Sequence, residues 1–243
     1  SVAQGQKVLA RFASKPFPED MSGEDIAKVV NGMPMYHGSR FSDYMFSARE
    51  RRSPKEFVLA EGFKGEGLSP KGNLGRGIYM TPSEDIAKGY GELLTLRTNF
   101  KNLYDINKLY EERRPHLGAV EFINAAEELG YPIERSFRSD DRNVVAIAKG
   151  RDIPFEQTPK LEKDFQEGLA PSDIRNRVLS SMGYDGLVQV TPGFTTEIVA
   201  FREPFEKAGD TLKDFYTGQR LQRKEGGIEG DSYGIEEYFK KLN

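Results

Sequence analysis

Apolar and polar positions follow one another along the chain in short blocks that predict several amphipathic helices. Residues 22–32 place apolar positions at helical spacing behind a capping serine, Ser22, and stop at Gly32. Residues 172–183 show the same spacing and end at Gly183. Further helices are predicted over 82–90, over 107–130 with a break near Pro115, and behind the capping box of residues 53–56.

Short apolar runs between these helices predict the strands. Single strands are expected over 33–38, 77–80, 93–100 and 144–148. Residues 187–190 and 197–201 fit two strands joined by the turn region TPGFTT, residues 191–196. Because helices and short strands are mixed without a regular strand–helix repeat, the fold class is expected to be α+β.

The amino-acid composition excludes several kinds of functional site. The chain has 243 residues, 30% of them charged, and no cysteine, which excludes disulfides, thiolate metal sites and cysteine nucleophiles. Two histidines far apart speak against a histidine-rich zinc site, so no metal is expected. The net charge is -3, so the chain has no overall positive charge that would favour nucleic-acid binding. This net charge does not exclude a local basic patch that binds nucleic acid.

No targeting signal is visible. No apolar run approaches the roughly 18 residues of a membrane span, and the first residues lack the apolar core of a secretory signal. We therefore expect a soluble chain with no membrane span. It would act in the cytoplasm or after delivery into a host cell, and its localisation stays open.

Four features could carry chemistry, and each has a plain structural alternative. The glycine-rich stretch 64–77 matches neither common phosphate-binding glycine pattern and reads as a mobile surface loop. Tyr79 and Tyr90 could hold a flat aromatic ligand between their rings or be ordinary core aromatics. Glu197 opens an apolar strand, as a functional carboxylate or as a solvated residue at a strand edge. His37 alone reads as a packed residue at a turn.

Taken in order, these fragments resemble a known catalytic core. The chain reads His-Gly-Ser-Arg at 37–40, Gly-Arg-Gly-Ile-Tyr at 75–79, a second tyrosine eleven residues later at Tyr90, and Glu-Ile-Val-Ala-Phe at 197–201. This series resembles the ADP-ribosyltransferases, in the branch of diphtheria toxin and the poly(ADP-ribose) polymerases with a His–Tyr–Glu triad. The resemblance implies a split antiparallel β core with flanking helices.

The same resemblance sets the expected domain bounds. Residues 1–32 would form an N-terminal helical extension and residues 33–205 the catalytic domain, with a possible insertion over 131–170. Residues 206–243 would form a C-terminal helical tail.

The resemblance also implies a role for each motif residue, with NAD as the co-substrate. His37 would bind the adenine-side ribose, the Gly38 backbone would read the nicotinamide carboxamide, and Ser39 would line the adenosine side. Tyr79 and Tyr90 would enclose the nicotinamide ring. His37, Tyr79 and Glu197 would form the catalytic triad.

Glu197 would bind the nicotinamide ribose and stabilise the positive charge that develops as nicotinamide leaves. Ala87 stands where the family often has a serine, so one hydrogen bond to nicotinamide would be absent. Phe194, in the loop before Glu197, would contact the acceptor. The second histidine, His116, matches no motif and is expected to be a surface or structural residue.

The resemblance predicts a mono-ADP-ribosyltransferase that modifies a macromolecule, and its compact organisation is similar to that of bacterial or phage effectors and toxins. A protein acceptor is favoured, since the short basic clusters at 49–55 and 220–224 read as solvated faces. Three alternatives stay open: an NAD glycohydrolase, transfer to nucleic acid, and an inactive binding module of the same fold.

Overall fold

The computed structural model describes residues 17–18, 20–39, 74–109, 117–134, 153–191 and 195–202. Several predictions fall outside these residues: the helix behind residues 53–56, the strand at 144–148, most of the glycine-rich stretch 64–77, and the tail over 206–243. Phe194 and His116 also lie outside the described residues.

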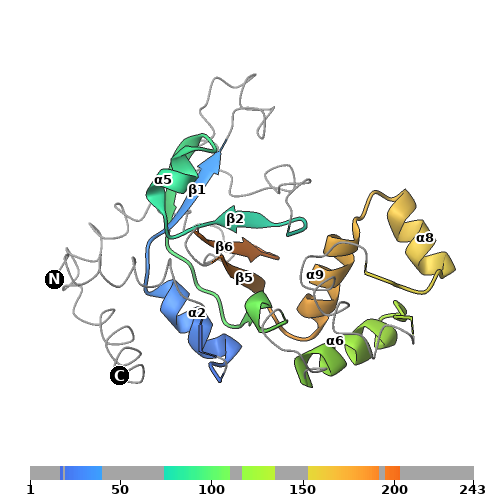
Figure 1. The fold of residues 1–243 in the computed structure, drawn as a ribbon. Helices are drawn as coiled ribbons and strands as arrows, with labels where there is room; N and C mark the ends of the chain where they lie inside the picture. The colour runs from blue at the N-terminus through green and yellow to red at the C-terminus, as the bar shows by residue number, and fades with distance from the viewer. Residues whose placement is uncertain are drawn as a thin grey trace.

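The described strands form two sheets (Figure 1). In the first, β1 (Met35–Ser39) pairs antiparallel with β3 (Glu92–Leu96). The strand order of the second is β2 (Ile78–Met80), β6 (Thr195–Ala200), β5 (Gly186–Thr191) and β4 (Leu103–Asp105). The mixed α+β class is thereby confirmed.

The pairing between β4 and β5 is parallel, so the prediction of an antiparallel core is wrong at this edge. The described residues between these two strands include the 3-10 turn η3 and the helices α6, α8 and α9, and a long crossover of this kind returns the second strand in the same direction as the first. All other described pairs are antiparallel, including the predicted β5–β6 pair.

The two sheets meet where β1 and β2 run side by side. The Tyr36 amide donates to the Thr81 carbonyl at 2.8 Å, and the Thr81 amide donates back to the Tyr36 carbonyl at 3.0 Å. This single antiparallel bridge joins a two-stranded to a four-stranded sheet. It also sets His37, one residue after Tyr36, close to Tyr79, two residues before Thr81.

The helices agree with the predictions to different degrees. Among the described residues they are α2 (Gly23–Asn31), α5 (Glu84–Lys88), α6 (Leu117–Glu128), α8 (Pro159–Gln166), α9 (Pro171–Ser181) and a 3-10 turn, η3 (Ile106–Leu109). Ser22 caps α2 as predicted, since its side chain accepts the Asp25 amide at 3.1 Å. No described helix has the length and apolar character of a membrane span.

Three predicted elements have wrong bounds. The helix expected over 82–90 is α5, which begins at Glu84 behind Ser83, because the backbone of Thr81 is already committed to Tyr36. Of the helix expected over 107–130 with a break near Pro115, the part after the break is α6, residues 107–109 belong to η3 instead, and residues 110–116 lie outside the described residues. The strand expected over 93–100 is β3, which begins at Glu92 and ends at Leu96.

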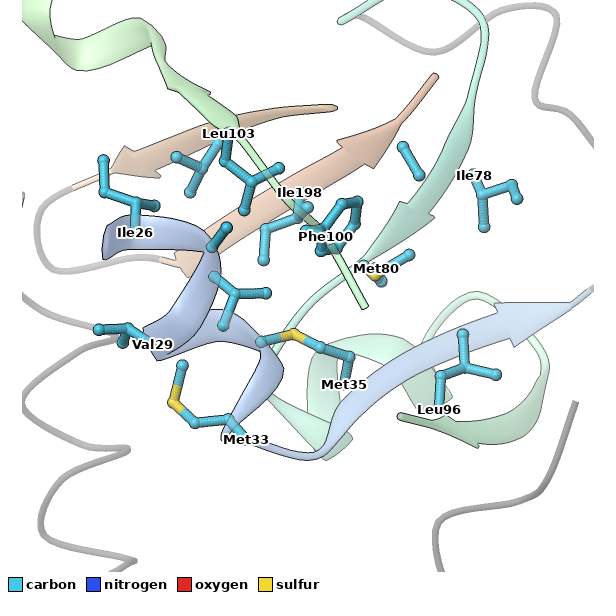
Figure 2. Close-up of a cluster of buried hydrophobic side chains, with 14 of the residues drawn as sticks. Ile26, Val29, Met33, Met35, Ile78, Met80, Leu96, Phe100, Leu103 and Ile198 are labelled. Atoms are coloured by element: carbon cyan, nitrogen blue, oxygen red, sulfur yellow. The ribbon is translucent and has the colours of Figure 1, made fainter. Parts of the chain in front are cut away.

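Two hydrophobic clusters cover the opposite faces of the second sheet. Side chains of α2 and of all six described strands form the first, in which Ile26 of α2 lies beside Leu103 of β4 (Figure 2). The second joins α6 and α9 to the other face at Leu187 and Val199. Because side chains alternate along a strand, Glu197 belongs to the same face as Val199.

Candidate functional site

His37 is oriented by the junction of the two sheets. Its Nδ1 lies 2.6 Å from the backbone carbonyl of Tyr79. A carbonyl oxygen only accepts hydrogen bonds, so Nδ1 must carry the hydrogen, and Nε2 is the acceptor of the neutral ring. A histidine held in this way can accept a hydrogen bond from a hydroxyl group.

The phenol of Tyr79 is fixed at both its donor and its acceptor sites. Its hydroxyl donates to the Gly75 carbonyl at 2.6 Å and accepts the Leu74 amide at 3.0 Å. Burial raises the pKa of Tyr79; the Leu74 amide lowers it, and the negative charge of Glu197 raises it further. Tyr79 is therefore a neutral, immobilised ring in the middle of β2.

Gly38 lies so close to the end of α5 that only glycine fits. A Cβ atom at this position would stand 2.0 Å from the Ala87 carbonyl oxygen and 2.9 Å from the Cβ of Tyr90. The same carbonyl accepts the Tyr90 amide at 3.0 Å. β1 thus brings Gly38, Ala87 and Tyr90 together, although α5 ends at Lys88 and leaves Tyr90 in the turn that follows.

The side chain of Tyr90 is 56% exposed, so it is not a core aromatic. Tyr79 is partly buried and packs against the second hydrophobic cluster. The two tyrosines of the motif therefore differ: Tyr79 is partly buried and held by hydrogen bonds, whereas Tyr90 is largely exposed. A flat ligand that covered Tyr90 would remove a large aromatic surface from water.

Glu197 lies on β6, which has a neighbouring strand on each side. Glu197 itself is paired with Gln189 of β5, and the register with β2 stops one residue later in the chain, at Ile198. Val199 pairs with Tyr79, so Glu197, two residues earlier, is on the same face of the sheet as the Tyr79 ring. Burial raises the pKa of Glu197. Within the described part of the chain its carboxylate makes no hydrogen bond and no ion pair.

Gln189 stands directly across from Glu197 in the β5–β6 pair, and directly opposed side chains point to the same face. The side-chain amide of Gln189, like the carboxylate of Glu197, has no hydrogen-bond partner among the described residues. The site thus offers a carboxylate and an amide side by side. The sequence analysis missed Gln189, although the register of the predicted hairpin could have pointed to it.

Helix α9 contributes residues that the sequence analysis also missed. Asp173 accepts the Arg76 amide at 2.7 Å, and the side chains of Arg175 and Asn176 both donate to the Leu74 carbonyl, at 2.7 and 2.8 Å. Residues 74–76 are therefore held in place, whereas a mobile surface loop was predicted for this end of the glycine-rich stretch. The helical pattern gave no signal, because it assigns polar positions to solvent.

The remaining predicted residues are placed as follows. Ser39 ends β1, where its backbone pairs with Glu92. Ala87 is 1% exposed, and it is the Ala87 carbonyl that faces Gly38. Over the described ranges, no cluster of three or more histidine or carboxylate side chains could hold a metal ion.

No protein-family model matches this chain, and neither does any curated protein or solved structure. A functional proposal therefore depends on the chemistry of the site itself and on the order of its motifs.

Proposed function

We propose that the protein is an NAD-dependent mono-ADP-ribosyltransferase that transfers ADP-ribose to a macromolecular acceptor, with protein favoured over nucleic acid. One observation carries the proposal: His37, Tyr79 and Glu197, far apart in the sequence, converge on adjoining strands. The split pair of sheets joined at Tyr36 and Thr81 is compatible with the ADP-ribosyltransferase fold.

The reaction breaks the bond between the ribose C1′ and the nicotinamide nitrogen of NAD. The bonding electrons go to the nicotinamide, which arrives as a cation and leaves neutral, so no general acid is needed. Positive charge develops on the ribose, and a fixed carboxylate stabilises it more in the transition state than in the ground state. Glu197 is suited to this role because its desolvated carboxylate has no competing partner within the described residues.

The acceptor then bonds to C1′ and loses its proton to Glu197 or to solvent. Gln189 supports this step, because its amide can donate to the ribose hydroxyls or accept from the incoming nucleophile while Glu197 stabilises the sugar. One carboxylate suffices here, whereas most glycosidases need a second carboxyl group to protonate a poor leaving group.

The other side chains would bind NAD. His37 would contact a ribose hydroxyl, since its Nδ1 donates to the Tyr79 carbonyl and fixes the plane of the ring. The nicotinamide would lie on the fixed ring of Tyr79 and be covered by the exposed ring of Tyr90. Its carboxamide would reach the backbone of Gly38, where the absence of a side chain permits close approach.

The test uses NAD labelled in its adenylate half and a whole-cell lysate. We expect a labelled macromolecule with the wild-type protein and none with Glu197→Gln. Glu156→Gln is the matched control, because Glu156 is an exposed carboxylate outside the site. Loss of the label on nuclease treatment would move the acceptor to nucleic acid, and labelling that persists in Glu197→Gln would overturn the proposal.

A further inference from the structure

Four neighbouring polar residues of α9 are buried, although apolar side chains could occupy these positions: Ser172, Asp173, Arg175 and Asn176. Asp173, Arg175 and Asn176 are called here the α9 polar cluster. Arg175 is only 1% exposed. A buried polar group costs free energy unless it is hydrogen-bonded, so the partners of these side chains show what the cluster does.

The α9 polar cluster directs hydrogen bonds to one short segment, residues 74–76. Two side-chain donors, from Arg175 and Asn176, meet at the Leu74 carbonyl, and Asp173 accepts the Arg76 amide. Asp173 also accepts the Ala170 amide at 2.7 Å at the start of α9, which fixes its own position. The segment is thus tied to the helix at both its ends.

The same segment holds the phenol of Tyr79. The amide of Leu74 donates to the phenol oxygen, and the phenol donates to the carbonyl of Gly75. Leu74 therefore binds α9 with its carbonyl and Tyr79 with its amide. Two consecutive hydrogen bonds, through a single residue, connect Asn176 to the Tyr79 ring.

The backbone at Gly75, between α9 and the Tyr79 phenol, has little room to move. Its φ of +91° lies in the left-handed region, and a Cβ atom there would stand 2.5 Å from Nδ2 of Asn176. The amide of Asn176 thus packs against the backbone that it helps to hold. A fully satisfied buried network of this kind fixes geometry more closely than apolar packing does.

We infer, on the basis of the proposed function, that Asn176 and Arg175 are positioning residues that hold the Tyr79 ring where nicotinamide binds. They touch no substrate and act through Leu74. Tyr79 contacts the nicotinamide ring both before and during bond cleavage, so loosening it removes binding that is common to the two states. Such a loss raises the KM for NAD and leaves kcat nearly unchanged.

The test variant is Asn176→Asp, which keeps the shape of the side chain and the oxygen that accepts from Arg175 Nε at 3.2 Å, but removes the donor to Leu74. A second variant at the same position, Asn176→Ser, has a shorter side chain without a carboxylate and is measured beside it. Arg177→Ala is the control on the same helix, because Arg177 donates to Tyr131 at 2.7 Å and to Asp164 at 3.3 Å instead. We expect the KM for NAD to rise about tenfold in both Asn176 variants, with kcat within about threefold of wild type. Arg177→Ala should keep the wild-type KM even if its Tm falls as much.

A double-mutant cycle separates positioning from general stability. In a Tyr79→Phe background the phenol no longer binds Leu74, so Asn176→Asp should add less than about a twofold further rise in KM. A full tenfold rise in that background, or equal KM values in Asn176→Asp and Arg177→Ala, overturns the inference while the proposed function stands. A wild-type protein that releases no nicotinamide from NAD removes the proposed function, and this inference with it.

Discussion

Replacing Gly38 by alanine tests the close approach of β1 to α5. The added Cβ atom would lie 2.0 Å from the Ala87 carbonyl oxygen and 3.0 Å from the Ala87 carbonyl carbon. Carbon atoms in ordinary contact stand about 3.5–4.0 Å apart, so the backbone must shift. The Ala87 carbonyl also accepts the Tyr90 amide, and its displacement therefore moves Tyr90 as well.

The losses of stability and of activity expected for Gly38→Ala can be estimated from this close contact. Overpacking of this kind costs about 1–3 kcal/mol, and each kcal/mol lowers the Tm of a chain of this size by about 2–4 °C. A shift of about 1 Å in a positioning group reduces turnover by up to about a hundredfold. We therefore expect Gly38→Ala to fold, to melt measurably lower, and to use NAD much less efficiently than wild type.

The assay pairs thermal unfolding with the rate of nicotinamide release over a range of NAD concentrations. Gly89→Ala is the matched control, because a Cβ atom at that exposed position would meet only the Ile86 carbonyl, at 3.2 Å. Gly89→Ala should keep the Tm and the kcat/KM of wild type. If Gly38→Ala behaves in the same way, β1 and α5 do not approach each other as described.

Three further predictions follow from the hydrogen bonds and charges of the site. Glu197→Gln should melt no lower than wild type at neutral pH, because burial raises the pKa of Glu197 and its ionised form costs stability above the ordinary glutamate range; a clearly lower Tm would indicate a structural role. Since the carboxylate must be ionised to act, the acid limb of the wild-type pH profile of kcat/KM should lie above the ordinary glutamate pKa, and a limb at or below it would count against Glu197. Tyr79→Phe should lower the free energy of unfolding in urea by about 1–3 kcal/mol, because Leu74 and Gly75 lose their hydrogen-bond partner; an unchanged midpoint would contradict the geometry.

The sequence predicted best those elements whose signals are local. The helix behind Ser22 and the β5–β6 hairpin formed where the pattern placed them, because capping residues and strand alternation act over a few positions. The start of the helix predicted over 82–90 was wrong for the opposite reason. The backbone of Thr81, just before that helix, is engaged by Tyr36, 45 positions away in the sequence, and no local pattern carries that information.

The residues of the candidate site also differ in how far the sequence predicts them. The motif order singled out His37, Tyr79 and Glu197 without the structure. Gln189 needed the strand register, and the α9 polar cluster needed the burial of side chains that an amphipathic pattern assigns to solvent. What could not be predicted are the contacts that hold the motif residues in place.

Release of nicotinamide from NAD, measured with purified protein in the presence and absence of lysate, tests the central claim most directly, because transfer and hydrolysis both produce it. A charge about 4 Å from the ribose, at an effective dielectric constant near 20, is worth about 4 kcal/mol, or roughly a thousandfold in rate. We therefore predict that the wild-type protein releases nicotinamide and that Glu197→Gln does so about a hundred- to a thousandfold more slowly. Equal rates for the two proteins, or no release by either, would contradict the account.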